Sequence, residues 1–513
     1  MKIRVLVPFL VPLLALAAVG CGGGDTPGEA SASTVDVTVS PPSVVVPPSG
    51  QRTFLATVSG TANLAVTWSV REGTAGGDVT SGGLYTAPGT TGSYHVVATS
   101  VADPTKSAAA SVTVTKPSSD LCAGLVQDKV AHPMTAVTKP GVGQTYVDPE
   151  FGTLVRRISD AATLVGASGI IKPMYSTIQA WNADESYLIL YHTGGTGAGH
   201  HLYDGKTYAH IKKLDIAPAD LEQVFWDTSN PKILYYVDGK KFKKFNVDTD
   251  TNATATVLRD FSTAPTSCTS NVDSGADPMF SSWDSRFFGL ECGDKQFAYD
   301  AVNNTVGTVV TVAAGGESVQ ASPSGARFFL DVSNAAQVRD PNMSLVRSLS
   351  GLGADSHSSQ GTADGVDTWF SVQFDAGVGS GTLFATDLTT GSTRALLAQS
   401  SGWPYPPHDT HICALSYKNP GWVVAGTIGA LTGGKLGQGV LENEIVLVNA
   451  NTGGGFCRVA HARTCADVCG TNGYWAETHN VISPRGTRIL FGSDWSGGAT
   501  VDTYVVELPS YVP

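Results

Sequence analysis

One repeated pattern limits the fold of this chain more than any other feature. After residue 147, a short strand, a turn of the type Ser/Trp-x-Asp/Pro-x-Gly and a strongly apolar strand recur, at a spacing of roughly 40 to 65 residues. The seven copies begin at Trp181, Trp226, Ser282, Ser322, Thr362, Ser416 and Ser483. A strand-rich unit of this length is typical of one propeller blade, and blades close in a ring that leaves no sheet edge exposed. The repeat therefore predicts a seven-bladed β-propeller over residues 147–513.

The last of the seven repeats is incomplete. Its sequence shows only three clear strands, at 479–483, 488–493 and 502–507. We expect residues 152–159, which lie ahead of the first repeat, to supply the missing outer strand and so to close the ring.

A different pattern occupies residues 35–116. Short alternating strands are separated by turn residues, which is typical of a β-sandwich, and we expect Trp68 to fill its core. The segments Gly83–Pro88 and Val97–Ser100 resemble bacterial Ig-like domains of surface proteins, and this resemblance implies a spacer. The predicted fold class is all-β: an Ig-like β-sandwich, a connector over residues 117–146, and then the seven-bladed β-propeller.

The N-terminal residues indicate export. Lys2 and Arg4 precede an uncharged apolar run, and small residues lead to Cys21, so residues 1–20 read as a secretory signal. The cleavage region resembles the bacterial lipobox, which implies a lipid on Cys21 and a flexible tether over residues 21–34. We therefore expect a lipoprotein anchored to the outer membrane, facing the periplasm or the cell surface. The alternative is a soluble secreted protein with an incidental cysteine.

Composition excludes some partners. Charged residues make up only 15% of the chain. The chain has 58 glycines, as expected where many short strands are joined by tight turns. The net charge is −12 without a basic cluster, which argues against nucleic acid as a partner. An anionic substrate would need a local basic pocket, because the overall field repels it. We expect a monomer whose partner is a carbohydrate or a surface protein.

Seven cysteines follow Cys21, and export makes disulfides possible. We expect Cys268 to pair with Cys292, and two members of the group Cys457, Cys465 and Cys469 to pair with each other. Zinc binding is the alternative for Cys465 and Cys469. The odd number leaves at least one free thiol or a longer-range partner.

Three histidines recur at one position of the repeat. His357, His411 and His479 lie where the innermost strand of three successive units begins, and Glu317 lies near that position in the preceding unit. Three imidazoles that converge on the central funnel suit a divalent metal, with Glu317, Glu477 or water completing the ligand set. They could equally transfer protons, or simply pack between blades.

The C-terminal segments also resemble a known family. His357–Gly365, His411–Trp422 and Tyr474–Trp495 resemble the oligogalacturonate lyase-type propellers. That family binds Mn²⁺ through several histidines and a glutamine, and cleaves uronate oligosaccharides by β-elimination. His479 matches its last metal histidine, whereas Glu477 stands in place of another histidine and Tyr474 in place of the glutamine. The catalytic histidine and arginine of the family have no clear counterpart here.

The resemblance implies a divalent metal, Mn²⁺ or Ca²⁺, and a uronate lyase. A base must remove the C5 proton, for which His411 and Tyr474 are candidates, and a cation such as Arg157 or Arg463 must neutralise the carboxylate. The alternative function is a non-catalytic module that binds glycans or proteins at the surface, as an adhesin or a scaffold. Propellers serve both roles, so the fold does not decide between them.

Overall fold

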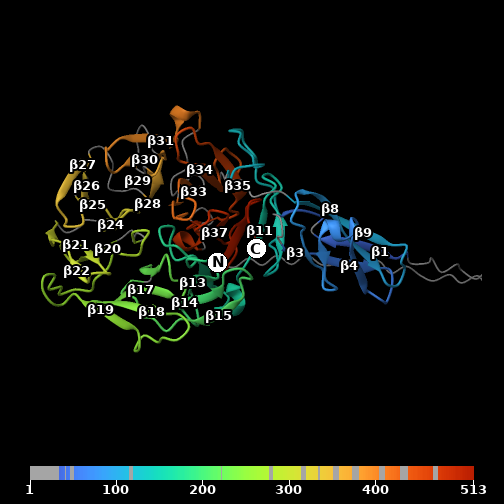
Figure 1. Ribbon diagram of the computed structural model, residues 1–513, viewed down its shortest axis with the longest axis horizontal. Helices are drawn as coiled ribbons and strands as arrows, with labels where there is room; N and C mark the ends of the chain where they lie inside the picture. Colours follow the sequence, from blue (N-terminus) through green and yellow to red (C-terminus); the bar gives the residue numbers. More distant parts are fainter. Residues whose placement is uncertain are drawn as a thin grey trace, which may run out of the picture.

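The computed structural model describes residues 34–40, 42–46, 51–114, 120–220, 222–275, 281–312, 319–332, 335–349, 357–372, 381–403, 411–427, 437–465 and 472–512. It consists of an elongated β-sandwich and a ring of sheets, with the connector at their junction (Figure 1). Cys21, Glu317 and Cys469 lie outside the described residues. Within the described residues, no helix has the length and apolar character needed to cross a membrane.

The N-terminal body is a β-sandwich, as predicted. Its strands are β1 (Asp36–Ser40), β2 (Ser43–Val46), β3 (Gln51–Thr53), β4 (Leu55–Ser59), β5 (Val66–Val70), β6 (Asp78–Val79), β7 (Leu84–Thr86), β8 (Gly92–Ser100) and β9 (Ser107–Val114). They form a four-stranded sheet in the order β2-β9-β8-β5, with the smaller sheets β3-β7-β6 and β1-β4. Phe54 and Tyr85 are fully buried in the core, and Trp68 packs half-buried beside them. Its assignment as Ig-like stays a prediction.

The described residues of the second body form seven sheets, one for each predicted repeat. The first three blades contain β12 (Ile170–Lys172), β13 (Tyr187–Thr193), β14 (Gly199–Asp204), β15 (His210–Lys213); β16 (Val224–Trp226), β17 (Ile233–Asp238), β18 (Lys241–Asn246), β19 (Thr256–Asp260); and β20 (Phe287–Cys292), β21 (Lys295–Asp300), β22 (Thr305–Val306), β23 (Val310–Thr311). The next two contain β24 (Val319–Ala321), β25 (Phe328–Val332), β26 (Ala335–Arg339), β27 (Leu345–Leu349); and β28 (Ser358–Ala363), β29 (Val366–Val372), β30 (Leu383–Asp387), β31 (Thr393–Leu397).

The sixth blade contains β32 (His411–Cys413), β33 (Trp422–Thr427), β34 (Glu444–Asn449) and β35 (Phe456–His461). The chain runs once around the ring, so that the seventh blade meets the first (Figure 1). Strands such as β33 and β34 are buried at nearly every residue because neighbouring blades cover both of their faces. This two-sided burial explains the strongly apolar strand in each repeat.

The seventh blade closes the ring with strands from both ends of the propeller. It follows the order β10-β11-β38-β37-β36, where β36 is Val481–Ile482, β37 is Arg488–Ser493 and β38 is Asp502–Glu507. Strand β11 (Leu154–Arg157) pairs antiparallel with β38. The prediction that residues 152–159 complete the last blade is confirmed. Strand β10 (Thr145–Val147) adds a fifth strand that the sequence did not indicate, and the short helix α1 (Ala161–Leu164) follows β11.

The turn glycine of the repeat has a conformational reason. Gly486 has φ of +79°, a left-handed value that costs other residues energy, and its N–H donates to the Ser483 carbonyl at 2.8 Å. Gly325 makes the same contact with Ser322 in the fourth blade. The turn therefore reverses the chain within four residues and delivers it into the apolar strand.

The connector is fastened to the sixth blade by a disulfide that the sequence did not predict, which rules out the predicted pairings of Cys457 and leaves the pairing of Cys465 with Cys469 as a prediction. Cys457, on β35, pairs with Cys122 of the connector rather than with Cys465 or Cys469, and Val126 forms a β-bridge with Arg458. The strand places Cys457 against a segment 335 residues away, a contact that local spacing does not reveal.

The other cysteines follow the predictions more closely. The pairing of Cys268 with Cys292 is confirmed. Cys465 is disulfide-bonded, which leaves no thiolate on this residue for zinc. Among the described residues, Cys413 is a free and buried thiol.

Candidate metal centre

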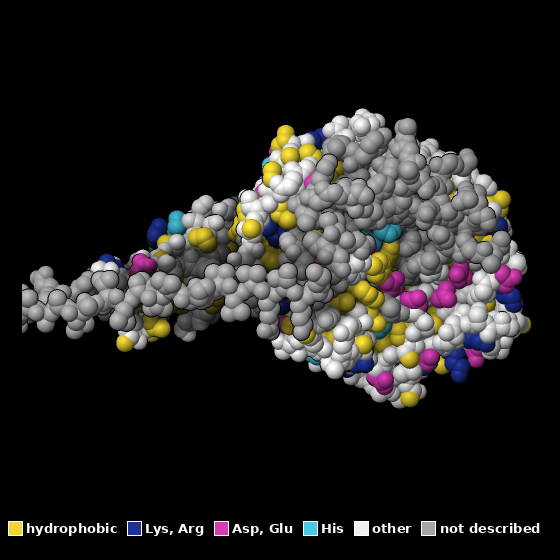
Figure 2. Space-filling view, turned by 180° about the vertical axis from the view of Figure 1, so that it is seen from behind, with side chains coloured by type: hydrophobic (Ala, Val, Ile, Leu, Met, Phe, Trp, Pro, Cys, Tyr) yellow, Lys and Arg dark blue, Asp and Glu magenta, His cyan; other side chains and the backbone are white. Residues whose placement is uncertain are grey.

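The three predicted histidines meet at one point. His357 immediately precedes β28, His411 begins β32, and His479 lies two residues before β36, so each enters the first strand of its blade. The ring centroids of His357 and His411 are 4.3 Å apart, and those of His411 and His479 are 4.2 Å apart. Figure 2 shows histidine side chains near the middle of one face of the propeller. We name these residues, with Lys172, Tyr175, Tyr474 and Glu477, the histidine centre.

Glu477 joins two of the histidines. Its Oε2 lies 2.6 Å from His411 Nε2, and its carbonyl oxygen lies 3.0 Å from His479 Nδ1. When Nδ1 of His479 donates its proton to that carbonyl, Nε2 is left with a lone pair for a cation. His479 also has φ of +37°, which is strained for a residue other than glycine. Such strain persists only where the surrounding structure enforces it, and it is concentrated at functional sites.

Lys172 is the residue of this centre that the sequence reasoning missed. It ends β12, the first strand of the first blade, and its side chain is fully buried. Its Nζ lies 2.9 Å from Nδ1 and 3.2 Å from Nε2 of His479. Burial lowers the pKa of Lys172 to about 7, against the opposing effect of Glu222 and Glu477. Its only sign in the sequence is a lysine directly after two isoleucines, which does not point to a contact with His479.

Burial also keeps the two inner histidines neutral. It lowers the pKa of His411 to about 3, with a smaller contribution from Lys172. Burial, followed by Lys172 and His411, lowers the pKa of His479 well below its ordinary value. Neutral imidazole is the form that binds a metal ion, so both side chains are ready to act as ligands near neutral pH.

Two tyrosines border the centre. The ring of Tyr175 lies 6.2, 5.5 and 5.3 Å from the rings of His357, His411 and His479, respectively. Tyr474 belongs to a short 3-10 helix (Gly473–Ala476), and its ring lies 4.6 Å from Lys172 Nζ. The hydroxyl of Tyr474, one of the two candidate bases, donates to Glu222 at 3.1 Å.

The two arginines considered as carboxylate clamps are engaged elsewhere. Arg157 bonds Asp502 at 3.0 Å, and Arg463 lies 3.4 Å from Glu150. Lys172 is therefore the cation that the described residues place at the histidine centre.

The donor set fits a divalent metal. One ligand atom from each of His411, Glu477 and His479 can be chosen so that all three lie within 4.8 Å of one another. Nδ1 of His411 is buried without a hydrogen-bond partner among the described residues. Two imidazoles and a carboxylate suit Mn²⁺ or Zn²⁺ better than Ca²⁺, which prefers oxygen ligands. The ammonium of Lys172 competes with a metal for His479.

Comparisons with known proteins support the fold. The sequence matches no protein-family model and no curated protein. It resembles a solved oligogalacturonate lyase in complex with manganese, with 14% identity over 71% of this chain and 96% of that chain, at a TM-score of 0.50. A second oligogalacturonate lyase, from Vibrio parahaemolyticus, is 10% identical over the same shares at a TM-score of 0.49. The first likeness shows the propeller fold.

Proposed function

We propose that this protein cleaves uronate-containing oligosaccharides by β-elimination, with a divalent metal held by His411, Glu477 and His479. The observation that carries the proposal is the convergence of these side chains, from two adjacent blades, on one point of the ring. The manganese-bound lyase that shares the fold supports it. We further propose export and anchoring through a lipid on Cys21, which would bring the propeller to extracellular glycans.

The reaction needs a positive charge, a base and a proton for the leaving group. A bound divalent metal supplies positive charge that binds the uronate carboxylate and acidifies the C5 proton. Lys172 adds a positive charge to the same place when protonated, in a chain whose net charge of −12 otherwise repels anions. Its contact with His479 also holds that imidazole in place.

His357 is the histidine best placed to act as the base. His411 and His479 are fully buried and belong to the metal set, whereas His357 is half-buried at the edge of the centre. Its imidazole accepts the proton from C5, the electron pair left behind forms the C4=C5 double bond, and the bond from C4 to the leaving sugar oxygen breaks. Water returns a proton to that oxygen. This assignment replaces His411 and Tyr474 as the predicted bases.

The second candidate is a non-catalytic glycan-binding module. One observation favours it: Lys172 contacts His479 directly, so an internal ammonium can satisfy the imidazole without a metal. In that case a carboxylated glycan would bind to Lys172 and the surrounding aromatic rings without being cleaved.

The experiment follows the unsaturated product. Purified protein is incubated with oligogalacturonate and Mn²⁺, and the ultraviolet absorbance of the C4=C5 double bond is recorded. We expect product from the wild type, none from His357→Ala despite retained metal, and none from His479→Ala together with weaker metal binding. His95→Ala, in the sandwich, is the matched control and should behave as the wild type. Absence of product across several uronate oligosaccharides overturns the lyase and leaves glycan binding.

A further inference from the structure

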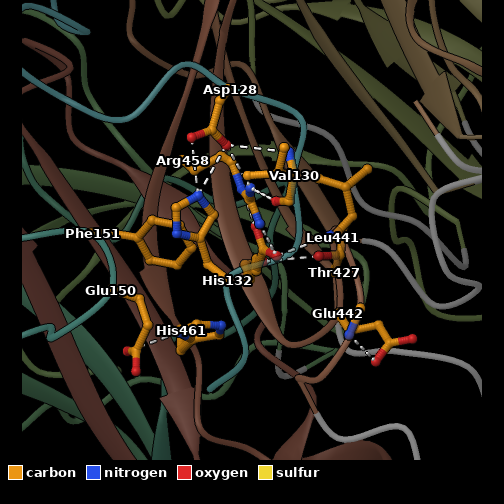
Figure 3. Close-up of polar contacts among 12 residues, drawn as sticks. Asp128, Val130, His132, Glu150, Phe151, Thr427, Leu441, Glu442, Arg458 and His461 are labelled. Carbon is orange, nitrogen blue, oxygen red and sulfur yellow. Dashed lines mark hydrogen bonds and ion pairs between the residues drawn. The ribbon is translucent and has the colours of Figure 1, made fainter. Parts of the chain in front are cut away.

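A second cluster of potential ligands lies where the closing hairpin meets the sixth blade. Asp148 and Glu150 follow β10, and His461 is the last residue of β35. Figure 3 shows Glu150 and His461 facing each other beside Phe151. The segments are joined by a hydrogen bond from the His461 N–H to Asp148 Oδ2 at 3.0 Å, across 313 positions of sequence. We name Asp148, Glu150 and His461 the clasp.

The imidazole of His461 lacks ordinary partners. Its side chain is fully buried, and neither ring nitrogen has a hydrogen-bond partner among the described residues. Its Nδ1 is directed at the two carboxylates, but at distances longer than a good hydrogen bond: 3.4 Å to Glu150 Oε2 and 3.9 Å to Asp148 Oδ1. A buried polar group without partners is rare and calls for an explanation, of which an ion is one.

These spacings suit a bound metal. One ligand atom from each clasp residue lies within 4.8 Å of the others. Ligand atoms that surround a tetrahedral ion at about 2.0–2.2 Å are about 3.4 Å apart, which is the separation of His461 Nδ1 from Glu150 Oε2. Two carboxylates and a neutral imidazole also carry enough negative charge to attract a divalent cation.

Neighbouring groups hold both carboxylates in place. Asp148 Oδ1 accepts from the backbone N–H groups of Glu150 and Phe151, both at 3.1 Å. Glu150 Oε1 accepts from the N–H and hydroxyl of Thr135. Supporting hydrogen bonds of this kind orient metal ligands in advance.

Arg463 offers a competing explanation. Its Nη2 lies 3.4 Å from Glu150 Oε2 and 3.6 Å from Asp148 Oδ2. It neutralises one of the two negative charges. Its contact with Glu150 is to Oε2, the oxygen that His461 Nδ1 also faces, whereas its contact with Asp148 is to Oδ2 rather than to the Oδ1 that faces the imidazole. A guanidinium only donates hydrogen bonds, so it offers no acceptor to the imidazole. The arginine therefore does not satisfy the imidazole, and one negative charge remains for a cation.

We propose that Asp148, Glu150 and His461 bind one divalent transition-metal ion, of the zinc class, at a structural site separate from the histidine centre. The imidazole nitrogen favours such an ion over Ca²⁺ or Mg²⁺. The ion joins the hairpin that closes the ring to the sixth blade. Because the two segments come together only in the folded chain, binding stabilises the closed ring.

The test uses full-length protein from which metal has been removed, with Zn²⁺ as the probe. The starting variant is His479→Ala, which removes a ligand of the histidine centre and so isolates the clasp. We expect this variant to retain one equivalent of Zn²⁺ in equilibrium dialysis, and to melt at a higher temperature with Zn²⁺ than without it. Adding His461→Gln or Glu150→Gln should lower the affinity by about tenfold or more.

Glu442→Gln is the matched control, since Glu442 lies near this region of the sixth blade but outside the clasp (Figure 3), and it accepts hydrogen bonds from the backbone N–H groups of Gln438 and Gly439. It should keep the zinc affinity of the starting variant. If a clasp variant fails to fold, the visible spectrum of Co²⁺ in the starting variant decides, because ligation by one nitrogen and oxygens gives absorption bands that free Co²⁺ lacks. A folded His479→Ala protein that binds no Zn²⁺ and shows no Co²⁺ bands overturns the proposal. That result leaves the lyase proposal standing on the histidine centre.

Discussion

The second and third blades differ from the fifth, sixth and seventh in what they bury between them. Where the second and third blades meet, aromatic rings pack edge to face around Phe288. The centroid of its ring lies 5.8 Å from that of Phe225, 5.4 Å from that of Tyr235 and 4.7 Å from that of Phe242. Where the fifth, sixth and seventh blades meet, the first strands bring together histidines and a glutamate. One architecture therefore accommodates both an apolar and a polar interior between its blades.

The difference separates the part of the ring that stabilises the fold from the part that forms a ligand site. Aromatic burial contributes stability directly, because apolar surface leaves water and the rings pack at favourable angles. Burying His411, His479, Glu477 and Lys172 costs free energy that only their mutual contacts offset. We therefore expect substitutions in the first region to affect stability most, and substitutions in the second to affect ligand binding most.

The largest effect should come from the cross-links that fasten these regions. In the chain-entropy model, a disulfide stabilises more when it closes a longer loop. The separation is 335 residues for Cys122–Cys457 on the sixth blade, and 24 for Cys268–Cys292 on the third. Replacing the first pair by serine should cost about 6 kcal/mol in the free energy of unfolding, against about 3.5 kcal/mol for the second. Urea unfolding measures both, and equal losses would contradict the loop argument.

The next effect concerns the aromatic interior itself. Phe288→Ala removes a buried ring from the cluster and leaves a cavity, which should cost about 3–5 kcal/mol. The metal affinity of Phe288→Ala should equal that of the wild type, because Phe288 belongs neither to the histidine centre nor to the clasp. Val302→Ala, at an exposed position, is the control and should change stability by no more than about 0.5 kcal/mol. A loss of metal binding in Phe288→Ala would show that the two regions are coupled.

The contrast between these regions also explains what could be read from the sequence. The repeat located the blades because each one must bury an apolar strand on both faces. His357, His411 and His479 could be found because they occupy one position of that repeat. Lys172 could not, because its contact with His479 spans 307 positions and crosses from the first blade to the seventh. The pairing of Cys122 with Cys457 was missed for a similar reason, because the connector meets the sixth blade across 335 positions and spacing along the chain does not encode that contact.

Histidines within a single blade provide a test that depends on pH. His192 on β13 stacks on His201 of β14 at 3.6 Å between centroids, and His210 of β15 lies beside them. Burial, followed by His201, His210 and Lys213, lowers the pKa of His192 to about 3. The unfolded chain takes up a proton near pH 6.5 and the folded chain does not, so stability falls as the pH drops from about 6.5 toward 3.

Replacing this histidine should flatten that dependence. Each pH unit within the window contributes at most about 1.4 kcal/mol, so His192→Gln should lose about 2 kcal/mol less than the wild type between about pH 6.5 and 5. Chemical denaturation at a series of pH values gives the two slopes. Parallel slopes would mean that His192 is protonated in the folded protein.

The smallest effect on stability is expected at the histidine centre. His479→Asn should change the free energy of unfolding of the metal-free protein by less than about 1 kcal/mol, although the side chain is fully buried. Asparagine tolerates the positive φ of this position and keeps a polar side chain beside Lys172. The same substitution should remove most of the rise in melting temperature produced by Mn²⁺, because one ligand is lost. Thermal melts with and without Mn²⁺ separate the two effects. A loss as large as that of Phe288→Ala would show that the centre is part of the packing that holds the blades together, and the division between the two regions would be wrong.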